Sequence, residues 1–439
     1  MRVSVIVTMP ARDTLRVASA SAFTAAAAGL QIAEPTKKGG LILDPSFPAL
    51  PLAAAAPDKI SLLAASAENA PLFIARGTIE AEKILDVRTK SAGVQIFADP
   101  EVGLYPHCGP SPIGARADVE KLLSVPNLAS KKLDGSRVAV AVMDTGINLA
   151  HLRKAGLKPS FDRTVFWAPS GVPRSPGAYP VDHGTMCAYD VLIAAPKATL
   201  LDFPILRSTT PGGSVMAGFL SDALLAFSYL RTAFTSPGWK YRGLVINNSW
   251  GMYHPSWDFP VGHPGRYSDN PNHPFNIITG TLARAGIDIL FAAGNCGKNC
   301  PDGRCKSVTK HTITGANAHP EVLTLAACDM TDDRLGYSSQ GPAIPGMAKQ
   351  KPDLTAYSHF VGSEAFGAGT PDSGTSTACP VAAGCVAAIR TRLRPSKVAP
   401  AQLFQAFKTH AAPKPAPGWN GDYGAGIIRP VLVASHFGL

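Results

Sequence analysis

Short runs of apolar residues alternate along most of this chain with segments that have the spacing of amphipathic helices. The apolar runs are rich in valine, isoleucine and leucine, and they lie at residues 137–143, 198–206, 243–248, 287–293 and 322–328. Helices are expected at residues 183–195, 214–231, 274–285 and 376–390. This alternation favours a mostly parallel sheet that is covered by helices on both faces. In such folds the binding and catalytic groups gather beyond the carboxyl ends of the strands.

The length of 439 residues allows for a large domain together with a smaller one. Hydrophobic residues make up 46 % of the chain and charged residues 16 %, which excludes a mainly disordered protein. The composition changes near residue 105, after a stretch rich in alanine and proline. We therefore expect a small αβ segment over residues 1–110, with strands at 71–77 and 94–98 and a helix at 78–88. A larger α/β domain is expected over residues 111–439.

The formal net charge is +10, but the basic residues are scattered and form no block of five or six. This distribution is typical of a soluble surface, so no nucleic-acid partner is expected. No uncharged run is long and apolar enough for a membrane span. The Ala-rich residues 17–33 make a poor signal peptide and fit a helix better. The compartment stays undetermined, with a slight preference for the cytoplasm.

Three short motifs carry the candidate chemistry. Asp144 ends the first apolar run, His183 opens a helix, and Ser376 opens the last predicted helix. Nucleophilic catalysis by a serine requires a base within hydrogen-bond reach and a carboxylate that orients the base. A serine at a helix start also meets unpaired N–H groups, which favour a developing oxyanion. The three residues therefore form a candidate catalytic set.

In this order, at separations of 39 and 193 residues, the motifs resemble those of the subtilisin family of serine peptidases. The resemblance runs from about residue 113 to the end of the chain. It implies a three-layer α/β subtilisin-like fold with a mostly parallel sheet, preceded by the small αβ N-terminal segment. It also implies a serine endopeptidase that hydrolyses peptide bonds through an acyl-enzyme on Ser376, with a polypeptide as its substrate partner.

The resemblance extends to two further sites. Asn295 ends an apolar strand in the sequence FAAGN, and in the family this asparagine donates a hydrogen bond to the oxyanion. Ser249, Trp250 and Gly251 resemble the strand that binds substrate, whose free edge would pair with an extended peptide. Trp250 is expected beside the specificity pocket. No acidic residue is evidently placed to bind a basic side chain, so we expect an apolar or broad preference.

Alternatives to this function stay open. A peptide ligase or macrocyclase would use the same three residues, with an amine in place of water. A non-catalytic peptide-binding module would keep the substrate strand and lose Ser376 or His183, and neither is replaced here. Residues 1–110 have the size of the propeptide that many subtilases carry, so they are expected to act as an intramolecular inhibitor or to form a permanent accessory domain.

The cysteines do not identify a cofactor. Cys187 lies one helical turn after His183, where we expect it to pack beneath the imidazole. Cys296, Cys300 and Cys305 crowd the loop after Asn295, and together with His311 they could bind zinc, although free thiols or a Cys300–Cys305 disulfide are favoured. Calcium is common in the resembling family, but no ligand set can be traced. No metal site is therefore assigned.

Overall fold

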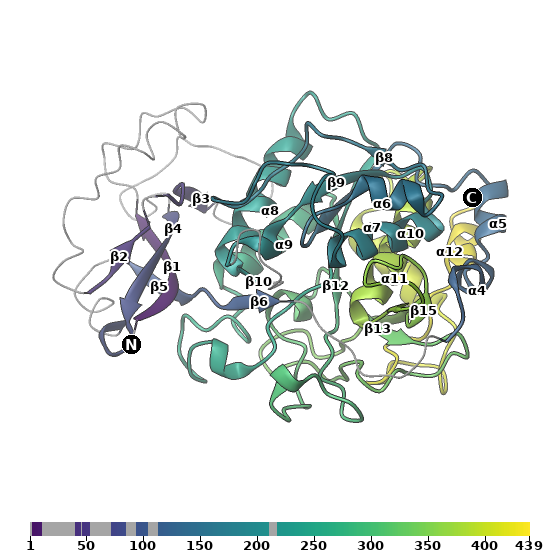
Figure 1. Ribbon diagram of the computed structural model, residues 1–439. Coiled ribbons are helices and arrows are strands. Elements are labelled where there is room, and N and C mark those ends of the chain that lie inside the picture. The colour runs from purple at the N-terminus through teal and green to yellow at the C-terminus, as the bar shows by residue number, and fades with distance from the viewer. Residues whose placement is uncertain are drawn as a thin grey trace.

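The computed structural model describes residues 2–10, 40–44, 46–52, 72–84, 94–103, 113–209 and 217–439. Its centre is a seven-stranded sheet in which every described strand pair is parallel, in the order β14-β13-β12-β11-β7-β9-β8 (Figure 1). The strands are β7 (Val138–Met143), β8 (Ser160–Phe161), β9 (Thr199–Phe203), β11 (Gly243–Asn248), β12 (Asp288–Ala292), β13 (Leu323–Cys328) and β14 (Leu354–Tyr357). The predicted parallel sheet is confirmed.

Helices cover both faces of this sheet, so the domain has three layers (Figure 1). Alternate residues of β7 show the two sides: Val138, Val140 and Val142 pack in one apolar core, and Ala139, Ala141 and Met143 pack in the other. The first core also receives α7 (His183–Ala194) and α10 (Thr375–Arg390). The second receives α8 (Leu220–Thr235) and α9 (Pro274–Arg284). Because the strands are buried on both faces, they read as nearly continuous apolar runs.

Shorter elements complete the domain. They are α4 (Arg116–Leu122), α5 (Val125–Ser130), α6 (Leu149–Lys154), α11 (Pro400–Thr409), α12 (Pro430–His436) and the pair β15 (Phe360–Val361) and β16 (Pro371–Asp372). Four 3₁₀ turns lie in the loops, at η3 (Ile205–Arg207), η4 (Pro255–Trp257), η5 (Gly303–Cys305) and η6 (Gly315–Ala318). No helix in the described part of the chain is sufficiently long and apolar for a membrane crossing.

The described part of the N-terminal segment is an antiparallel sheet in the order β2-β4-β1-β5, with β3 also paired to β4. Its strands are β1 (Arg2–Pro10), β2 (Ile42–Leu43), β3 (Leu50–Leu52), β4 (Leu72–Glu80) and β5 (Gln95–Ala98). A further strand, β6 (Glu101–Gly103), pairs with β10 (Ala217–Phe219) of the larger domain.

The helix expected at residues 78–88 is wrong where the structure describes it. Thr78 and Ile79 pair with Ser4 and Val3 of β1, so β4 runs on to Glu80 and only the 3₁₀ turn η2 (Ala81–Lys83) follows. Tertiary pairing with a strand that was not predicted has overridden the local helical spacing. The helix expected at residues 17–33 and the linker expected at residues 105–110 lie outside the described residues.

The N-terminal sheet contacts the face of the large domain that carries α8 and α9. The amide of Ala98 donates to the carbonyl of Gly265 at 2.8 Å, and the ring Nε2 of His273 lies 2.9 Å from the carbonyl of Ala98. Asp99 accepts hydrogen bonds from both the amide and the hydroxyl of Ser221, each at 2.8 Å, at the start of α8. Backbone and side-chain contacts therefore join the two parts of the chain.

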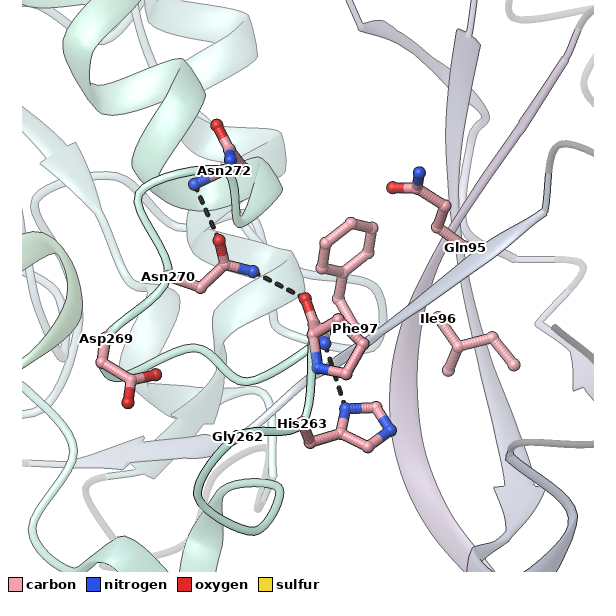
Figure 2. A pocket seen from close by; sticks show the side chains of 10 residues that line it. Gln95, Ile96, Phe97, Gly262, His263, Asp269, Asn270 and Asn272 are labelled. Atoms are coloured by element: carbon pink, nitrogen blue, oxygen red, sulfur yellow. Dashed lines mark hydrogen bonds between the residues drawn. The ribbon is translucent and has the colours of Figure 1, made fainter. Parts of the chain in front are cut away.

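Beside these contacts lies a cavity of about 390 Å³, between β5 and the loop of residues 262–272. Figure 2 shows how the loop is braced: the amide group of Asn270 donates to the carbonyl of Pro264 and its oxygen accepts from the amide of Asn272. None of the candidate catalytic residues lines this cavity. It belongs to the junction between the two parts of the chain and not to the active site.

Candidate active site

Three neighbouring strands bring the candidate residues to one edge of the sheet. Asp144 directly follows β7, Ser249 directly follows β11, and Asn295 comes three residues after β12. These strands lie side by side in the order β12-β11-β7. The carboxyl ends of parallel strands meet at one edge, which is where the sequence analysis placed the chemistry.

The Asp144 carboxylate holds the ring of His183. Ring Nδ1 lies 3.0 Å from each carboxylate oxygen, and both residues are buried. The amide of Thr145 donates to the same carboxylate at 2.8 Å. A carboxylate at Nδ1 fixes the proton on that nitrogen, which leaves Nε2 as the basic atom. The pair is therefore arranged as the orienting carboxylate and the general base of a serine hydrolase.

His183 is the first residue of α7, and Asp182 caps this helix by accepting a hydrogen bond from the His183 amide at 2.8 Å. The loop after Asp144 lies directly against this helix start. The hydroxyl of Thr145 accepts from the amide of Gly184 at 2.9 Å, and a Cβ on Gly184 would come within 2.6 Å of the carbonyl of Gly146. A side chain at position 184 would collide with this carbonyl, so the residue that follows His183 must be glycine.

Ser376 is the second residue of α10 and exchanges hydrogen bonds with Ser249. Its hydroxyl donates to the carbonyl of Ser249 at 3.1 Å, and the hydroxyl of Ser249 donates to the carbonyl of Ser376 at 2.9 Å. Nε2 of His183 is buried and has no hydrogen-bond partner among the described residues. The serine and the histidine are nevertheless neighbours, since the Cys187 sulfur lies 3.6 Å from both the His183 Nδ1 and the Ser376 carbonyl. The hydroxyl must turn from Ser249 toward His183 before it can react.

Asn295 is fixed by the start of α10. Its side-chain oxygen accepts from the amide of Thr375 at 2.9 Å and from the Thr375 hydroxyl at 3.0 Å. Because the oxygen is held in this way, the orientation of the amide group is set, and its nitrogen is the donor that an oxyanion requires. The Ser376 N–H lies in the first turn of the same helix, where amides have no partner within the helix. Asn295 and α10 together form a candidate oxyanion hole.

The side chain of Trp250 packs in the apolar core. The indole is fully buried between Phe275 and Phe291, with ring centroids 5.9 and 5.4 Å away. Its carbonyl accepts from the side chain of Asn317 at 2.9 Å. A large aromatic side chain gains more by packing in the core beneath the sheet than at its edge. The side chain of Trp250 therefore belongs to the core of the domain.

The cysteine-rich loop after Asn295 contains a disulfide between Cys296 and Cys305. The predicted pairing of Cys300 with Cys305 is therefore wrong, although Cys300 is disulfide-bonded as well. Zinc binding requires free thiolates, so the zinc site suggested for these cysteines with His311 does not fit this arrangement. His311 contacts the carbonyl of Ala343 at 3.0 Å through Nδ1. Disulfides persist mainly in oxidising compartments, which opposes the slight preference for the cytoplasm.

Cys187 is a buried thiol at the Asp144–His183 pair. Its sulfur lies 3.5 Å from the Asp144 carboxylate, and burial together with that charge raises the pKa of the thiol well above its usual value. Asp144, His183 and Cys187 form a compact group of possible metal ligands, but a neutral thiol is a poor ligand. Cys187 therefore packs beneath the histidine, as expected from the sequence.

The candidate catalytic residues are buried in this structure. Asp144, Asn295 and Ser376 have no exposed surface, and His183 is only 4 % exposed. A peptide must reach the hydroxyl of Ser376 to react with it. The arrangement of the site is therefore that of a serine hydrolase whose reacting groups are buried.

Several supporting residues were not predicted from the sequence. Asp182 caps α7, Thr375 holds Asn295, and the side chain of Asn247 donates to the Ser249 hydroxyl at 3.0 Å. Asp182 and Thr375 each stand directly before a predicted catalytic residue. The N-cap preference for aspartate was the available signal for Asp182, whereas Thr375 follows the N-cap Gly374 and had no such signal.

Comparison with known proteins agrees with this geometry. A model described as the subtilase family matches residues 135–426. The chain is also 25 % identical over 283 residues to subtilisin E of Bacillus subtilis (strain 168). That alignment covers 62 % of this chain and 60 % of the relative. The chain therefore spans less than two thirds of the length of this relative.

Proposed function

The chain belongs to the subtilase family of serine peptidases, and from this premise we propose that it is an endopeptidase that hydrolyses peptide bonds through an acyl-enzyme on Ser376. One observation carries the proposal, the position of His183 with Nδ1 at 3.0 Å from both oxygens of Asp144 and with Ser376 beside it. This set supplies a nucleophile, a base and an orienting carboxylate.

Each residue has a stated part in the proposed reaction. The Ser376 hydroxyl attacks the carbonyl carbon of the scissile bond while Nε2 of His183 accepts its proton. Asp144 stabilises the imidazolium that forms. The amide group of Asn295 and the N–H of Ser376 bind the oxyanion of the tetrahedral intermediate. His183 then protonates the leaving amine, and water repeats the sequence on the acyl-enzyme.

We propose that substrates bind as an added strand along Ser249–Gly251. The backbone of this segment follows β11 and lies against Ser376 through the two hydrogen bonds described above. Because the Trp250 side chain is buried in the core, the backbone supplies the contact and the side-chain preference is set elsewhere. An extended peptide is the ligand that such a backbone edge recognises.

We propose further that residues 1–110 act as an intramolecular inhibitor. Two observations support this: the N-terminal segment contacts the large domain through Asp99 and Ser221, and the candidate catalytic residues are buried. A segment that docks on the domain and precedes the catalytic part of the chain is well placed to restrain it until cleavage.

The proposed function is tested with a fluorophosphonate probe, which phosphonylates activated serines. The processed wild-type chain should be labelled at one residue, Ser376, and should cleave a casein or peptide-library substrate with new free amino termini. Ser376→Ala should lose both labelling and cleavage. Ser435→Ala, which changes an exposed serine of α12, is the matched control and should keep both.

Two results would contradict the proposal. Labelling that persists in Ser376→Ala would mean that another residue is the nucleophile. Labelling without hydrolysis, but with products extended by an added amine, would identify a ligase in place of a hydrolase. Mass spectrometry of the products separates these two outcomes from simple inactivity.

A further inference from the structure

A second cavity, of about 600 Å³, lies at the opposite edge of the sheet from the candidate active site. Arg137 precedes β7, Arg242 precedes β11 and Gly286 lies two residues before β12, so all three mark the amino ends of strands. The carboxyl ends of the same strands lead to Asp144, Ser249 and Asn295. A volume of this size is typical of sites for small molecules.

The walls of this cavity are strongly basic. Five cationic side chains line it, and no aspartate or glutamate does: Arg137, Lys240, Arg242, Arg284 and Arg394. In the sequence these residues are up to 257 positions apart, which is why the net charge of +10 looked scattered there. The fold gathers them around one hollow, where their fields add.

Only two of the five cations are neutralised by a carboxylate among the described residues. Lys240 pairs with Asp162 at 2.8 Å and Arg284 with Glu321 at 2.5 Å, and neither carboxylate lines the cavity. Arg242 donates one N–H to the carbonyl of Thr391 at 2.9 Å, which satisfies a hydrogen bond without cancelling charge. Arg137 and Arg394 are exposed and have no carboxylate within ion-pair distance in the described part of the chain. Three positive charges therefore remain available to a ligand.

Hydrogen-bond donors and a helix end add to this charge. Nε of Arg242 and Nε1 of Trp239 are buried without an acceptor among the described residues, so this wall has more donors than the protein itself uses. The cavity also reaches Ala399 and Pro400, the N-cap and first residue of α11, where a helix of ten residues presents its positive end. Donors and positive charge together favour an oxyanion.

One wall is aromatic. Trp239 packs edge to face against Phe234 and Tyr241, with ring centroids 5.4 and 5.1 Å away. All three residues line the cavity. An aromatic wall beside several arginines suits a ligand that has a planar group next to its charged end.

We propose that this basic cavity is a binding site for a small ligand that carries several phosphate groups. The guanidinium groups of Arg137 and Arg394 bind the phosphate oxygens, since arginine matches phosphate geometry with paired donors. The site is distinct from the catalytic centre, and its occupation does not depend on the proposed peptidase activity. A nucleotide or an inorganic polyphosphate would satisfy the same chemistry.

The test uses the full chain with Ser376→Ala, which prevents self-cleavage, and calorimetric titration with inorganic tripolyphosphate at low salt. We expect one saturable site with a dissociation constant below about 1 mM. Binding should weaken as salt is added, because the contacts are charge pairs. The double change Arg137→Gln and Arg394→Gln should weaken it by about tenfold or more, since two exposed charge contacts are lost.

The matched control removes two exposed cations elsewhere, with Lys121→Gln on α4 and Lys154→Gln on α6, and it should bind as the parent does. Equal weakening in both double variants would mean that only net charge matters, and would overturn the proposal, as would the absence of saturable binding.

ATP serves as the second probe. ATP that binds more tightly than tripolyphosphate, with the advantage lost in Trp239→Leu, supports a nucleotide as the ligand. Equal binding of the two probes supports phosphate alone as the recognised group.

Discussion

Thr375 holds the side-chain oxygen of Asn295 from two sides, with its amide at 2.9 Å and its hydroxyl at 3.0 Å. The same hydroxyl accepts a hydrogen bond from the amide of Gly294 at 3.0 Å. One threonine at the start of α10 therefore couples the helix that carries the nucleophile to the strand end that carries the oxyanion donor. This coupling makes Thr375 a positioning residue of the proposed oxyanion hole.

Thr375→Val should lower kcat roughly tenfold and leave KM nearly unchanged. Valine keeps the shape of threonine but loses the hydroxyl, so Asn295 is held by one hydrogen bond instead of two and the donor is less well aimed in the transition state. The variant should also lose about 1–3 kcal/mol of stability, because the amide of Gly294 is left buried without an acceptor. Thr375→Ser is the control and should retain most of the activity. Steady-state kinetics on a peptide substrate and thermal unfolding measure the two effects, and an unaltered kcat would remove Thr375 from this role.

Asn295→Ala should lower turnover by about 10² to 10³, the size known for loss of this donor from a subtilisin. Peptide affinity should change little, since the amide acts mainly on the charge of the transition state. A double-mutant cycle with Thr375→Val sharpens the test. If Thr375 works through Asn295, the second change should add little to the first, because the two act as a unit. Fully additive losses would mean that Thr375 acts independently of Asn295.

The sequence predicted the central sheet and the strand and helix ends at which the four candidate residues stand, for a physical reason. Strands that are buried on both faces leave long apolar runs, and residues such as Asp144 and Asn295 end these runs with polar groups. Short motifs around Asp144, His183 and Ser376 then mark the element ends where a parallel sheet gathers its chemistry. Each apolar run or motif lies within a short stretch of sequence, so it can be recognised without knowledge of the fold.

Other features depend on contacts between distant parts of the chain and could not be predicted. The strand at 78–80 exists because β1 pairs with it, and the partner of Cys305 depends on how the loop after Asn295 closes. Trp250 looks the same in sequence whether it faces a pocket or the core. The basic cavity is the extreme case, because its cations are far apart in the sequence and meet only in the folded domain.

Mercurial reagents should inhibit the enzyme although its mechanism uses no thiol. A metal on the Cys187 sulfur, which lies 3.6 Å from Nδ1 of His183, would displace the imidazole from Asp144. Cys187→Ala should keep most of the activity and lose the sensitivity. Cys385→Ala, which removes another buried free thiol, should remain sensitive and is the matched control. A Cys187→Ala variant that has no activity would show that the thiol does more than pack beneath the ring.

Asp190→Asn should stabilise the protein at alkaline pH. Asp190 is fully buried on α7, and burial together with the nearby carboxylate of Asp372 raises its pKa well above the usual value. Burial likewise raises the pKa of Asp372 to about 6. Since both folded-state pKa values exceed the unfolded value near 3.8, the pair stabilises the fold most at low pH. The Asp372 share of this contribution is lost as pH rises through about 6, and the Asp190 share as pH rises through its own raised pKa.

Thermal unfolding of Ser376→Ala, with and without Asp190→Asn, measures this effect between pH 4 and 8. The two midpoints should nearly coincide at pH 4, where Asp190 is protonated, and the Asn variant should unfold at a higher temperature at pH 8. A difference that is the same at every pH would show that the buried charge is not its cause.

The N-terminal segment should be released by self-cleavage between about residues 100 and 112. Gly103 is fixed by the pairing of β6 with β10, and the amide of Ile113 donates to the carbonyl of His359 at 2.8 Å, so the segment to be cut joins two anchored ends. The sequence of residues 104–112 contains three prolines and one glycine, which predict little regular structure. Wild-type protein should yield a fragment of roughly 330 residues, and Ser376→Ala should stay at full length.

Residues 1–110 added in trans should inhibit the shortened enzyme, and Asp99→Ala should weaken this inhibition by about tenfold or more. Asp99 accepts two hydrogen bonds from Ser221, and hydrogen bonds to a charged group are the stronger kind. Glu101→Ala removes an exposed carboxylate two residues away and should leave the inhibition unchanged. Inhibition constants for the three versions of the segment measure the contribution of this contact. A wild-type chain that is fully active while still 439 residues long would rule out the inhibitor role, because the docked segment would then leave the site open.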